Sequence, residues 1–368
     1  MTAVSTRPKP VPARAKPARP KALRIGRVSI RWRPRHLVVV LVASTVALAV
    51  AVVAAGTGDF TIAPGRVVEV LLGGGTRREE LVIVTIRLPR VLIGLAVGIA
   101  LAVSGAIVQT TARNSLASPD LLGVTAGASV GAVAVIILGG NSGQVSGMLE
   151  AIGVPVGALI GGLAASTLVL LLMRGRGASG LQPILIGVGV SALLGGLVSW
   201  MMVSATITDA ARANVWLTGS LNGRSWNELW ALLAVIVISS AVLVPLSTRL
   251  GTIDLGNDVA RGLGVPMVLT QGSLLLVAVI LASATTAAAG PIGFVALVCP
   301  HLARLASGAS RPPLVASGAV GALLVVGSDL VARTVLAPIQ LPAGAITALV
   351  GAPFLLWLLI RTRREARR

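Results

Sequence analysis

The chain has 368 residues, of which 55% are apolar and only 12% are charged. Apolar runs of about 18 residues or more recur along it, which predicts a polytopic all-α membrane protein and excludes a β-barrel, whose strands alternate residue by residue. The net charge of +19 does not indicate a nucleic-acid partner, because it lies in two tails and because aromatic residues, at 2% with no Tyr, leave little to stack on bases.

The two tails are strongly basic. Residues 1–36 hold eleven Lys and Arg without an acidic residue, and residues 361–368 hold five Arg with one Glu. Basic segments beside apolar spans favour the cytoplasmic side and contact with anionic membrane lipid. We therefore expect 1–36 to be a disordered cytoplasmic tail, 37–360 the membrane domain and 361–368 a second cytoplasmic tail. A cleaved signal peptide is the alternative for the first segment, although its charged and apolar parts are longer than usual.

Ten membrane spans are predicted. In chain order they are about 37–55, 91–110, 121–138, 151–173, 184–203, 229–246, 267–289, a short span from the Gly290–Gly293 break to about 305, 314–330, and one ending near 360. Ten spans put both termini on one side, which the basic tails place on the cytoplasmic face of the plasma membrane. The long polar connection at 204–228 is expected to contain a short helix over 210–218.

The residues needed for common catalytic chemistry are missing from the membrane domain. All three lysines, Lys9, Lys16 and Lys21, lie in the first tail, so the chain has no P-loop lysine and is not expected to hydrolyse ATP. The single cysteine, Cys299, excludes an internal disulfide and is read as a small buried hydrophobe. His301 has no acidic or cysteine array around it at metal-ligand spacing, so a structural role is favoured and no bound cofactor or metal is expected.

The polar stretch 249–265, between the sixth and seventh predicted spans, has its own helical pattern. Asp254 is a candidate N-cap, and Gly262 and Gly264 are stop signals. Leu255, Val259 and Leu263 fall on one helical face. The pattern fits either an interfacial helix lying on lipid or a docking helix for a cytoplasmic partner.

Arginines near the outer ends of the spans go against the usual charge bias. Arg87, Arg90 and Arg333 are the clearest, and an acidic docking surface or an anionic substrate would attract them. The alternative is lipid headgroup binding and local ion pairing, because Asp329 and Arg333 are four residues apart on a predicted helix.

Two further patterns concern helix contacts and a loop. Glycines four residues apart in the third and fourth spans (Gly123, Gly127 and Gly131; Gly153, Gly157 and Gly161) predict close helix packing, within the chain more than between subunits.

The loop 112–120, ARNSLASPD, is either an ordinary turn or a constriction on the cytoplasmic side of a transport path.

Four ordered motifs resemble the FecCD/BtuC-type permeases of bacterial importers for iron–siderophore complexes and vitamin B12. They are RLPRVLIGLAVGIALAVSGAIVQTTARNSLASPDLLGVTAGASVGA (87–132), DLGNDVARGLGV (254–265), GPIGFVALVCPHLARL (290–305) and SDLVARTVLAPIQLPAGAITALVGAPFLLWLLIR (328–361). The segment VWLTGSLNGRSW (215–226) looks most like the ferric-enterobactin branch, whose two permease subunits are usually different chains.

The resemblance implies a type II ABC importer permease fold and a set of partners. These are a second permease subunit, two cytoplasmic ATPase subunits that hold ATP and Mg²⁺, and an outer substrate-binding protein. The residues matching the family's ATPase-coupling segment are Asp254, Leu255, Gly256, Asp258, Val259, Ala260, Arg261, Leu263 and Gly264. Those matching the binding-protein contacts are Arg87, Arg90 and Arg333, and those matching a cytoplasmic gate are Asn114 and Leu116. Ser115 stands where the family commonly has Pro, so a less rigid loop is expected.

The resemblance favours an importer of ferric siderophores, with vitamin B12 or haem as alternative substrates. An ion-coupled secondary transporter acting alone is a remote alternative, because the spans hold no run of acidic residues for a proton relay. A membrane scaffold without transport activity is the third reading, and it would need neither a gate nor outer arginines.

Overall fold

A computed structural model describes residues 22–25, 28–31, 34–58, 60–140, 148–173, 182–254 and 256–366. Helices dominate this part of the chain, apart from one antiparallel ribbon of β1 (Ala22–Ile25) and β2 (Val28–Arg31). The ribbon lies inside the segment 1–36, so the expected disorder of that tail concerns mainly residues outside the described ones and stays a prediction.

The helices follow one another through short connections. They are α1 (Pro34–Gly56), α2 (Pro64–Leu71), α3 (Arg77–Glu80), the π-helix η1 (Leu81–Arg87), α4 (Leu88–Ala112), the 3₁₀ helix η2 (Pro119–Leu122), α5 (Val124–Gly140), α6 (Met148–Met173), α7 (Gln182–Val203), α8 (Ile207–Leu217), α9 (Trp226–Ile253), α10 (Asn257–Gly262), α11 (Met267–Ala289), α12 (Val295–Ser307), α13 (Leu314–Thr334) and α14 (Ala343–Ala366). The short helix expected over 210–218 is confirmed as α8.

Eight of the described helical segments are long and apolar enough to cross a membrane. Two further predicted spans correspond to the shorter apolar helices α5 and α12. Several predicted boundaries shift. The first long helix begins at Pro34, and the sixth runs on to Ile253, about two turns beyond the predicted end near 246.

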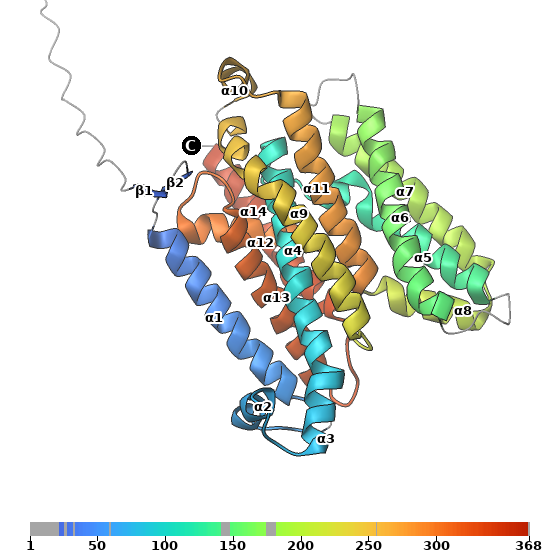
Figure 1. Ribbon diagram of the computed structural model, residues 1–368. Coiled ribbons are helices and arrows are strands. Elements are labelled where there is room, and N and C mark those ends of the chain that lie inside the picture. The colour runs from blue at the N-terminus through green and yellow to red at the C-terminus, as the bar shows by residue number, and fades with distance from the viewer. Residues whose placement is uncertain are drawn as a thin grey trace, which may run out of the picture.

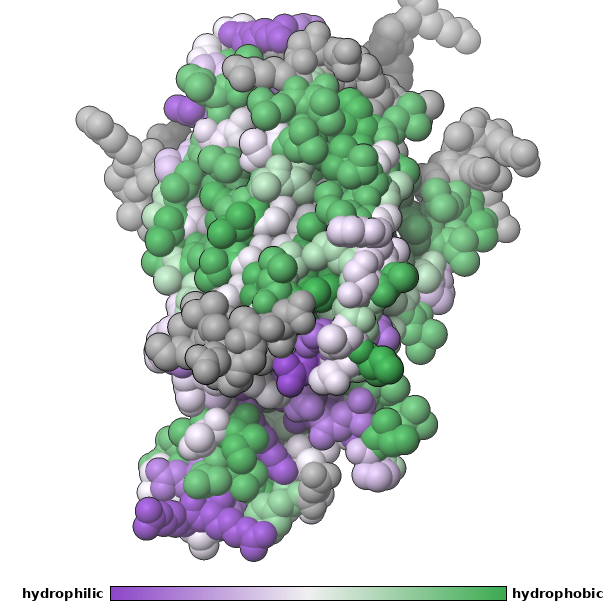
Figure 2. Space-filling view, turned by 90° about the vertical axis from the view of Figure 1, so that its right-hand side faces the viewer, coloured by the Kyte–Doolittle hydropathy of each residue, from purple (hydrophilic) through white to green (hydrophobic). Residues whose placement is uncertain are grey.

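The bundle has two distinct ends. In Figure 1 the helix α10 lies at the top, which we call the α10 end, and the C-terminal end of α14 lies below it on the left. The start of α1 lies on the same side of the bundle, because His36 lines a pocket with Leu250 and Asp254 at the end of α9. The helices α2 and α3 lie at the bottom, which we call the α2 end. On the face shown in Figure 2, hydrophobic residues cover the middle and hydrophilic residues gather at both ends, as expected for a membrane-spanning bundle.

Helix α4 is the centre of the bundle. It continues α3 and η1 as one helical rod, Arg77–Ala112, and 78% of the residues in the most apolar stretch of this rod are buried. Small residues let its neighbours approach closely, since a Cβ added to Gly98 would lie 2.3 Å from the carbonyl oxygen of Gly321 in α13. The Ser104 hydroxyl donates to the carbonyl of Ala278 in α11 at 2.6 Å, a polar tie between two buried helices.

The predicted glycine ladders join α5 to α6 within the chain. A Cβ on Gly127 would lie 2.3 Å from the Gly161 carbonyl oxygen, and one on Gly131 would lie 2.0 Å from that of Gly157. The prediction of close intramolecular packing is therefore confirmed for these four glycines. Gly123 instead ends η2 in a left-handed conformation, with φ of 73°.

Candidate functional site

The short helix α10 stands at the α10 end between α9 and α11. The prediction that Asp254 caps this helix is wrong, because Asp254 is the C-cap of the extended α9. The N-cap of α10 is Gly256, whose φ of 117° is a conformation that favours glycine. Leu255, predicted to belong to the apolar face, lies outside the described residues. The helix ends at Gly262 and the chain turns back through Gly264 with φ of 78°.

Helix α10 presents apolar side chains to its surroundings. Val259 is 51% exposed and Leu263 61% exposed, while Ala260 between them is completely buried and anchors the helix. Asp258 and Arg261 form an exposed ion pair at 3.6 Å, which contributes little to stability. An anchored helix with two uncovered apolar residues is a suitable docking element for a partner groove or for lipid.

The loop after α4 is tied directly to the start of the α10 segment. The Arg113 guanidinium donates to the carbonyl of Ile253, the last residue of α9, from Nε at 3.1 Å and from Nη2 at 2.8 Å. Arg113 has a left-handed backbone conformation with φ of 49°. The side chain of Asn114 accepts from the backbone N–H of Leu116 at 2.9 Å, so the two predicted gate residues share one tight turn.

At the α2 end, the structure brings Arg87, Arg90 and Arg333 together around Asp329. Arg90 donates to Asp329 Oδ1 from Nη2 at 2.8 Å, and Arg333 Nη2 lies 2.9 Å from Asp329 Oδ2. Arg87 binds two backbone carbonyls, of Ala55 at 3.1 Å and Phe60 at 2.7 Å. The local pairing considered from the sequence is thus present, in a cluster of three guanidinium groups and one carboxylate.

The cluster is almost completely covered. The exposed fractions are 9% for Arg87, 8% for Arg90, 8% for Arg333 and 2% for Asp329. In this arrangement the arginines hold the ends of α1, α4 and α13 together, because Arg333 also donates to the carbonyl of Ala54 at 3.1 Å. A partner carboxylate could contact these guanidinium groups only by replacing one of the present acceptors.

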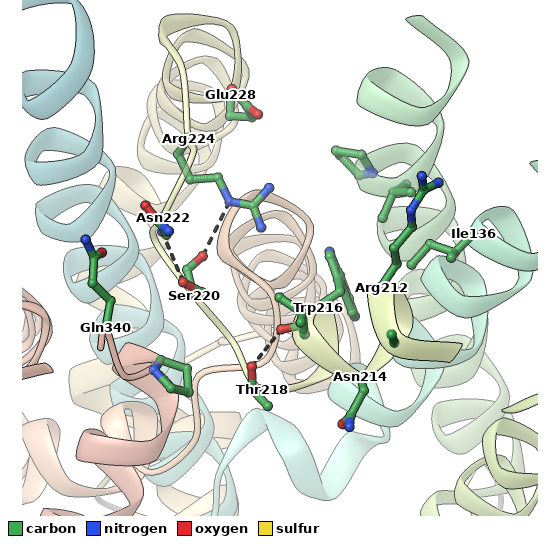
Figure 3. Close-up of a pocket in the computed structure, with 15 residues that line it drawn as sticks. Ile136, Arg212, Asn214, Trp216, Thr218, Ser220, Asn222, Arg224, Glu228 and Gln340 are labelled. Atoms are coloured by element: carbon green, nitrogen blue, oxygen red, sulfur yellow. Dashed lines mark hydrogen bonds between the residues drawn. The ribbon is translucent and has the colours of Figure 1, made fainter. Parts of the chain in front are cut away.

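A pocket of about 790 Å³ opens beside this cluster, and Figure 3 shows its polar residues. Two of its lining residues, Asn222 and Gln340, also accept from Nη1 of Arg90, at 3.2 and 3.0 Å. The other lining residues come from α5, α6, α8, the connection to α9, the first turn of α9, and the segment before α14: Ile136, Val154, Pro155, Ala211, Arg212, Asn214, Val215, Trp216, Thr218, Ser220, Arg224, Glu228 and Pro342. We call this the outer pocket.

The residues that line the outer pocket were not predicted as a site. Its lining is spread over segments more than 200 residues apart, from Ile136 to Gln340 and Pro342. The one available signal was the unusually long polar connection at 204–228, which supplies most of the lining.

The whole helical domain matches a known family. The model of the FecCD transport family matches residues 34–361. The chain belongs to this family. The FecCD-family match covers all the elements that carry α10, the Arg113 loop, the arginine cluster and the outer pocket.

Individual FecCD-type relatives are similar along nearly their full length. The chain is 37% identical to the Probable siderophore transport system permease protein YfhA of Bacillus subtilis (strain 168), over 89% of this chain and 96% of that protein. It is 35% identical to the Ferric enterobactin transport system permease protein FepG of Escherichia coli (strain K12), over 84% and 91%. It is 34% identical to the Vitamin B12 import system permease protein BtuC of Citrobacter koseri, over 92% and 96%.

A solved structure agrees with the fold. A metal-chelate-type ABC transporter in an inward-facing conformation is similar with a TM-score of 0.75 and 29% identity, over 88% of this chain and 99% of that one. This FecCD-family chain is therefore a non-catalytic, multi-pass membrane subunit of ABC importer type.

His301 and Cys299, for which structural roles were predicted, both lie inside the protein. Buried His301 lies edge-on to the ring of Phe354, with centroids 5.8 Å apart, and Cys299 is buried and free. Among the residues that the structure describes, no group of three or more His, Cys, Asp or Glu side chains could hold a metal ion.

Proposed function

We propose that this FecCD-family chain is the permease subunit of an ATP-driven importer that moves ferric-siderophore complexes into the cytoplasm. Ten helices would cross the membrane, the eight long ones together with α5 and α12. The observation that carries the mechanism is the pair of uncovered apolar residues, Val259 and Leu263, on an anchored helix outside the apolar belt.

The α10 end would be cytoplasmic. Both basic tails begin there, and the inner surface of a bacterial-type membrane is where Lys and Arg next to spans are retained. The α2 end, with the arginine cluster and the outer pocket, would then face the outside.

Two cytoplasmic ATPase subunits would bind α10 and its flanks, residues 254–264, on this chain and on a second FecCD-type permease chain of different sequence. ATP and Mg²⁺ would be held by the ATPases, and no cofactor by this chain. A nucleotide-bound ATPase that binds one position of α10 better than another would shift the permease between outward-open and inward-open states. Arg113 supports a direct mechanical connection between α10 and the transport path. Its side chain joins the end of α9 to the turn of Asn114 and Leu116, which we propose as the cytoplasmic gate.

At the outer face, a substrate-binding protein would dock near the arginine cluster. Three guanidinium groups around one carboxylate leave excess positive charge, which attracts an acidic protein surface and speeds its association. Direct contact with Arg87, Arg90 or Arg333 would require a carboxylate of that protein to displace an acceptor of the cluster.

Reconstitution of the complex in liposomes tests the proposal. With the ATPases, the second permease and the binding protein present, we expect a ferric siderophore to accumulate only when ATP is available to the ATPases. Uptake by this chain without any ATPase, driven by an ion gradient, would support the secondary-transporter alternative. Accumulation of vitamin B12 or haem in place of the ferric complex would support the substrate alternatives.

We expect Arg113→Asn to uncouple ATP hydrolysis from transport. Asn tolerates the left-handed backbone of this position but cannot bridge to Ile253, so the gate turn loses its connection to α9. The number of ATP molecules hydrolysed per chelate transported should rise severalfold while ATPase binding is retained. Arg249→Gln, the same charge change at an exposed site of α9, is the matched control. An unchanged ratio in Arg113→Asn would rule out this route.

A further inference from the structure

The walls of the outer pocket carry positive charge. Figure 3 shows Arg224 and Arg212 on opposite walls, with the ring of Trp216 between them. Trp216 is only 9% exposed, and its indole Nε1–H has no acceptor in the described part of the chain. This nitrogen has almost no accessible surface, so a ligand in the pocket meets the ring of Trp216 and not its N–H.

Arg224 is held in a way that leaves donors for a ligand. Its one hydrogen bond to the described residues runs from Nε to the carbonyl of Ser220 at 3.4 Å, so both Nη groups remain available. Burial lowers the pKa of the Arg224 guanidinium, and the charge of Glu228 only partly opposes this effect. The positive charge is therefore poorly solvated, and an anionic ligand in the pocket would stabilise it.

Glu228 is the acidic side chain of the pocket wall, and one of its carboxylate oxygens is already occupied. One oxygen accepts from the backbone N–H of Ser225 at 2.9 Å and from the Ser225 hydroxyl, as the capping box of α9. The neighbouring cluster around Asp329 adds further positive charge behind Asn222 and Gln340. Two arginines of the wall, Arg212 and Arg224, face one acidic residue, so the field in the pocket favours anions.

We propose that the outer pocket is a charge-selective binding site that admits negatively charged, oxygen-rich ferric chelates in preference to neutral ones. Iron(III) bound by catecholate groups carries excess negative charge on its oxygens, whereas iron(III) bound by hydroxamates forms a neutral complex. The Nη groups of Arg224 would donate to the exposed oxygens of the anionic chelate, and Arg212 would add long-range attraction. The volume of about 790 Å³ lies in the range of small-molecule sites. This inference rests on the proposed function and adds the substrate class.

The test measures chelate binding to the complete permease–ATPase complex in nanodiscs of zwitterionic lipid, without the binding protein. Two probes are used, a ferric tris-catecholate complex and a ferric tris-hydroxamate complex, each labelled with radioactive iron. We expect the wild type to bind the catecholate complex at least about tenfold more tightly, with an affinity that falls as salt is added. Equal affinities, or binding of neither probe, would overturn the inference.

Two substitutions locate the effect. Arg224→Gln should weaken binding of the catecholate complex about tenfold to a hundredfold, the range for one charge-assisted hydrogen bond, and leave the hydroxamate complex unaffected. Arg78→Gln makes the same charge change at the α2 end outside the pocket, where Arg78 lies 4.9 Å from the ring of Phe60, and is expected to bind like the wild type.

The outcomes separate this inference from the proposed function. An equal loss for both probes in Arg224→Gln would show a structural effect and overturn charge selection. A reconstituted importer that moves the hydroxamate complex better than the catecholate complex would overturn it too, while leaving the importer intact. A complex that transports no ferric chelate with any binding protein would instead contradict the proposed function.

Discussion

Changing Val259 and Leu263 together to Asp should abolish recovery of the ATPase with this permease. Val259 on α10 and Leu263 at its C-cap are both more than half exposed, and a partner groove that covers the exposed half would gain about 1–1.5 kcal/mol for each. Placing carboxylates there removes this gain and adds the cost of desolvating two charges. We expect the dissociation constant of the ATPase to rise at least about a hundredfold, measured by co-purification and by titration of the detergent-solubilised permease.

The matched control keeps the same positions apolar. Val259→Met with Leu263→Met preserves the apolar face and should retain ATPase binding, because Met adapts to irregular grooves. Amounts of both variants in the membrane fraction should equal the wild type, since neither residue is buried in the bundle. Normal ATPase recovery from the Asp variant, together with weaker membrane association of α10, would mean that the helix lies on lipid.

The sequence predicted the bundle well because its signals are local. Apolar length identifies the spans, and glycines four residues apart predicted the contact between α5 and α6. The boundaries were less predictable. Pro245 and Gly251, together with the polar residues Arg249 and Thr252, hid the continuation of α9, which nevertheless runs to Ile253 with Asp254 as its C-cap. The Asp254 cap failed for that reason.

The sites were predicted only in part, because they depend on contacts between distant segments. The spacing of Asp329 and Arg333 predicted their ion pair, but nothing local indicated that Arg90, 239 residues earlier, shares the same carboxylate. Nor could the sequence show that the three arginines are covered, since span ends are normally exposed to water. The outer pocket is formed by four separate stretches of chain, so its charge became visible only in three dimensions.

The second large effect is expected for Asp329→Asn. The substitution leaves the volume almost unchanged but removes the one carboxylate between Arg90 and Arg333, which are both about nine-tenths buried. Removing one partner of a buried ion pair costs about 3–5 kcal/mol, because the remaining charge stays desolvated. Thermal unfolding in detergent should therefore occur at a clearly lower temperature, and Glu69→Gln, which breaks the exposed pair with Arg66, should change it little.

A second substitution separates charge repulsion from simple loss of a hydrogen bond. If unbalanced charge is the cause, adding Arg333→Gln to Asp329→Asn should recover part of the lost stability, because one uncompensated guanidinium is removed with the carboxylate. A loss of packing alone would make the double variant less stable than the single one.

The same measurement of thermal unfolding also tests how the binding protein docks. If a partner carboxylate can occupy the place of Asp329, an acidic binding protein should stabilise the Asp329→Asn permease more than the wild type, by direct ion pairing with Arg90 and Arg333.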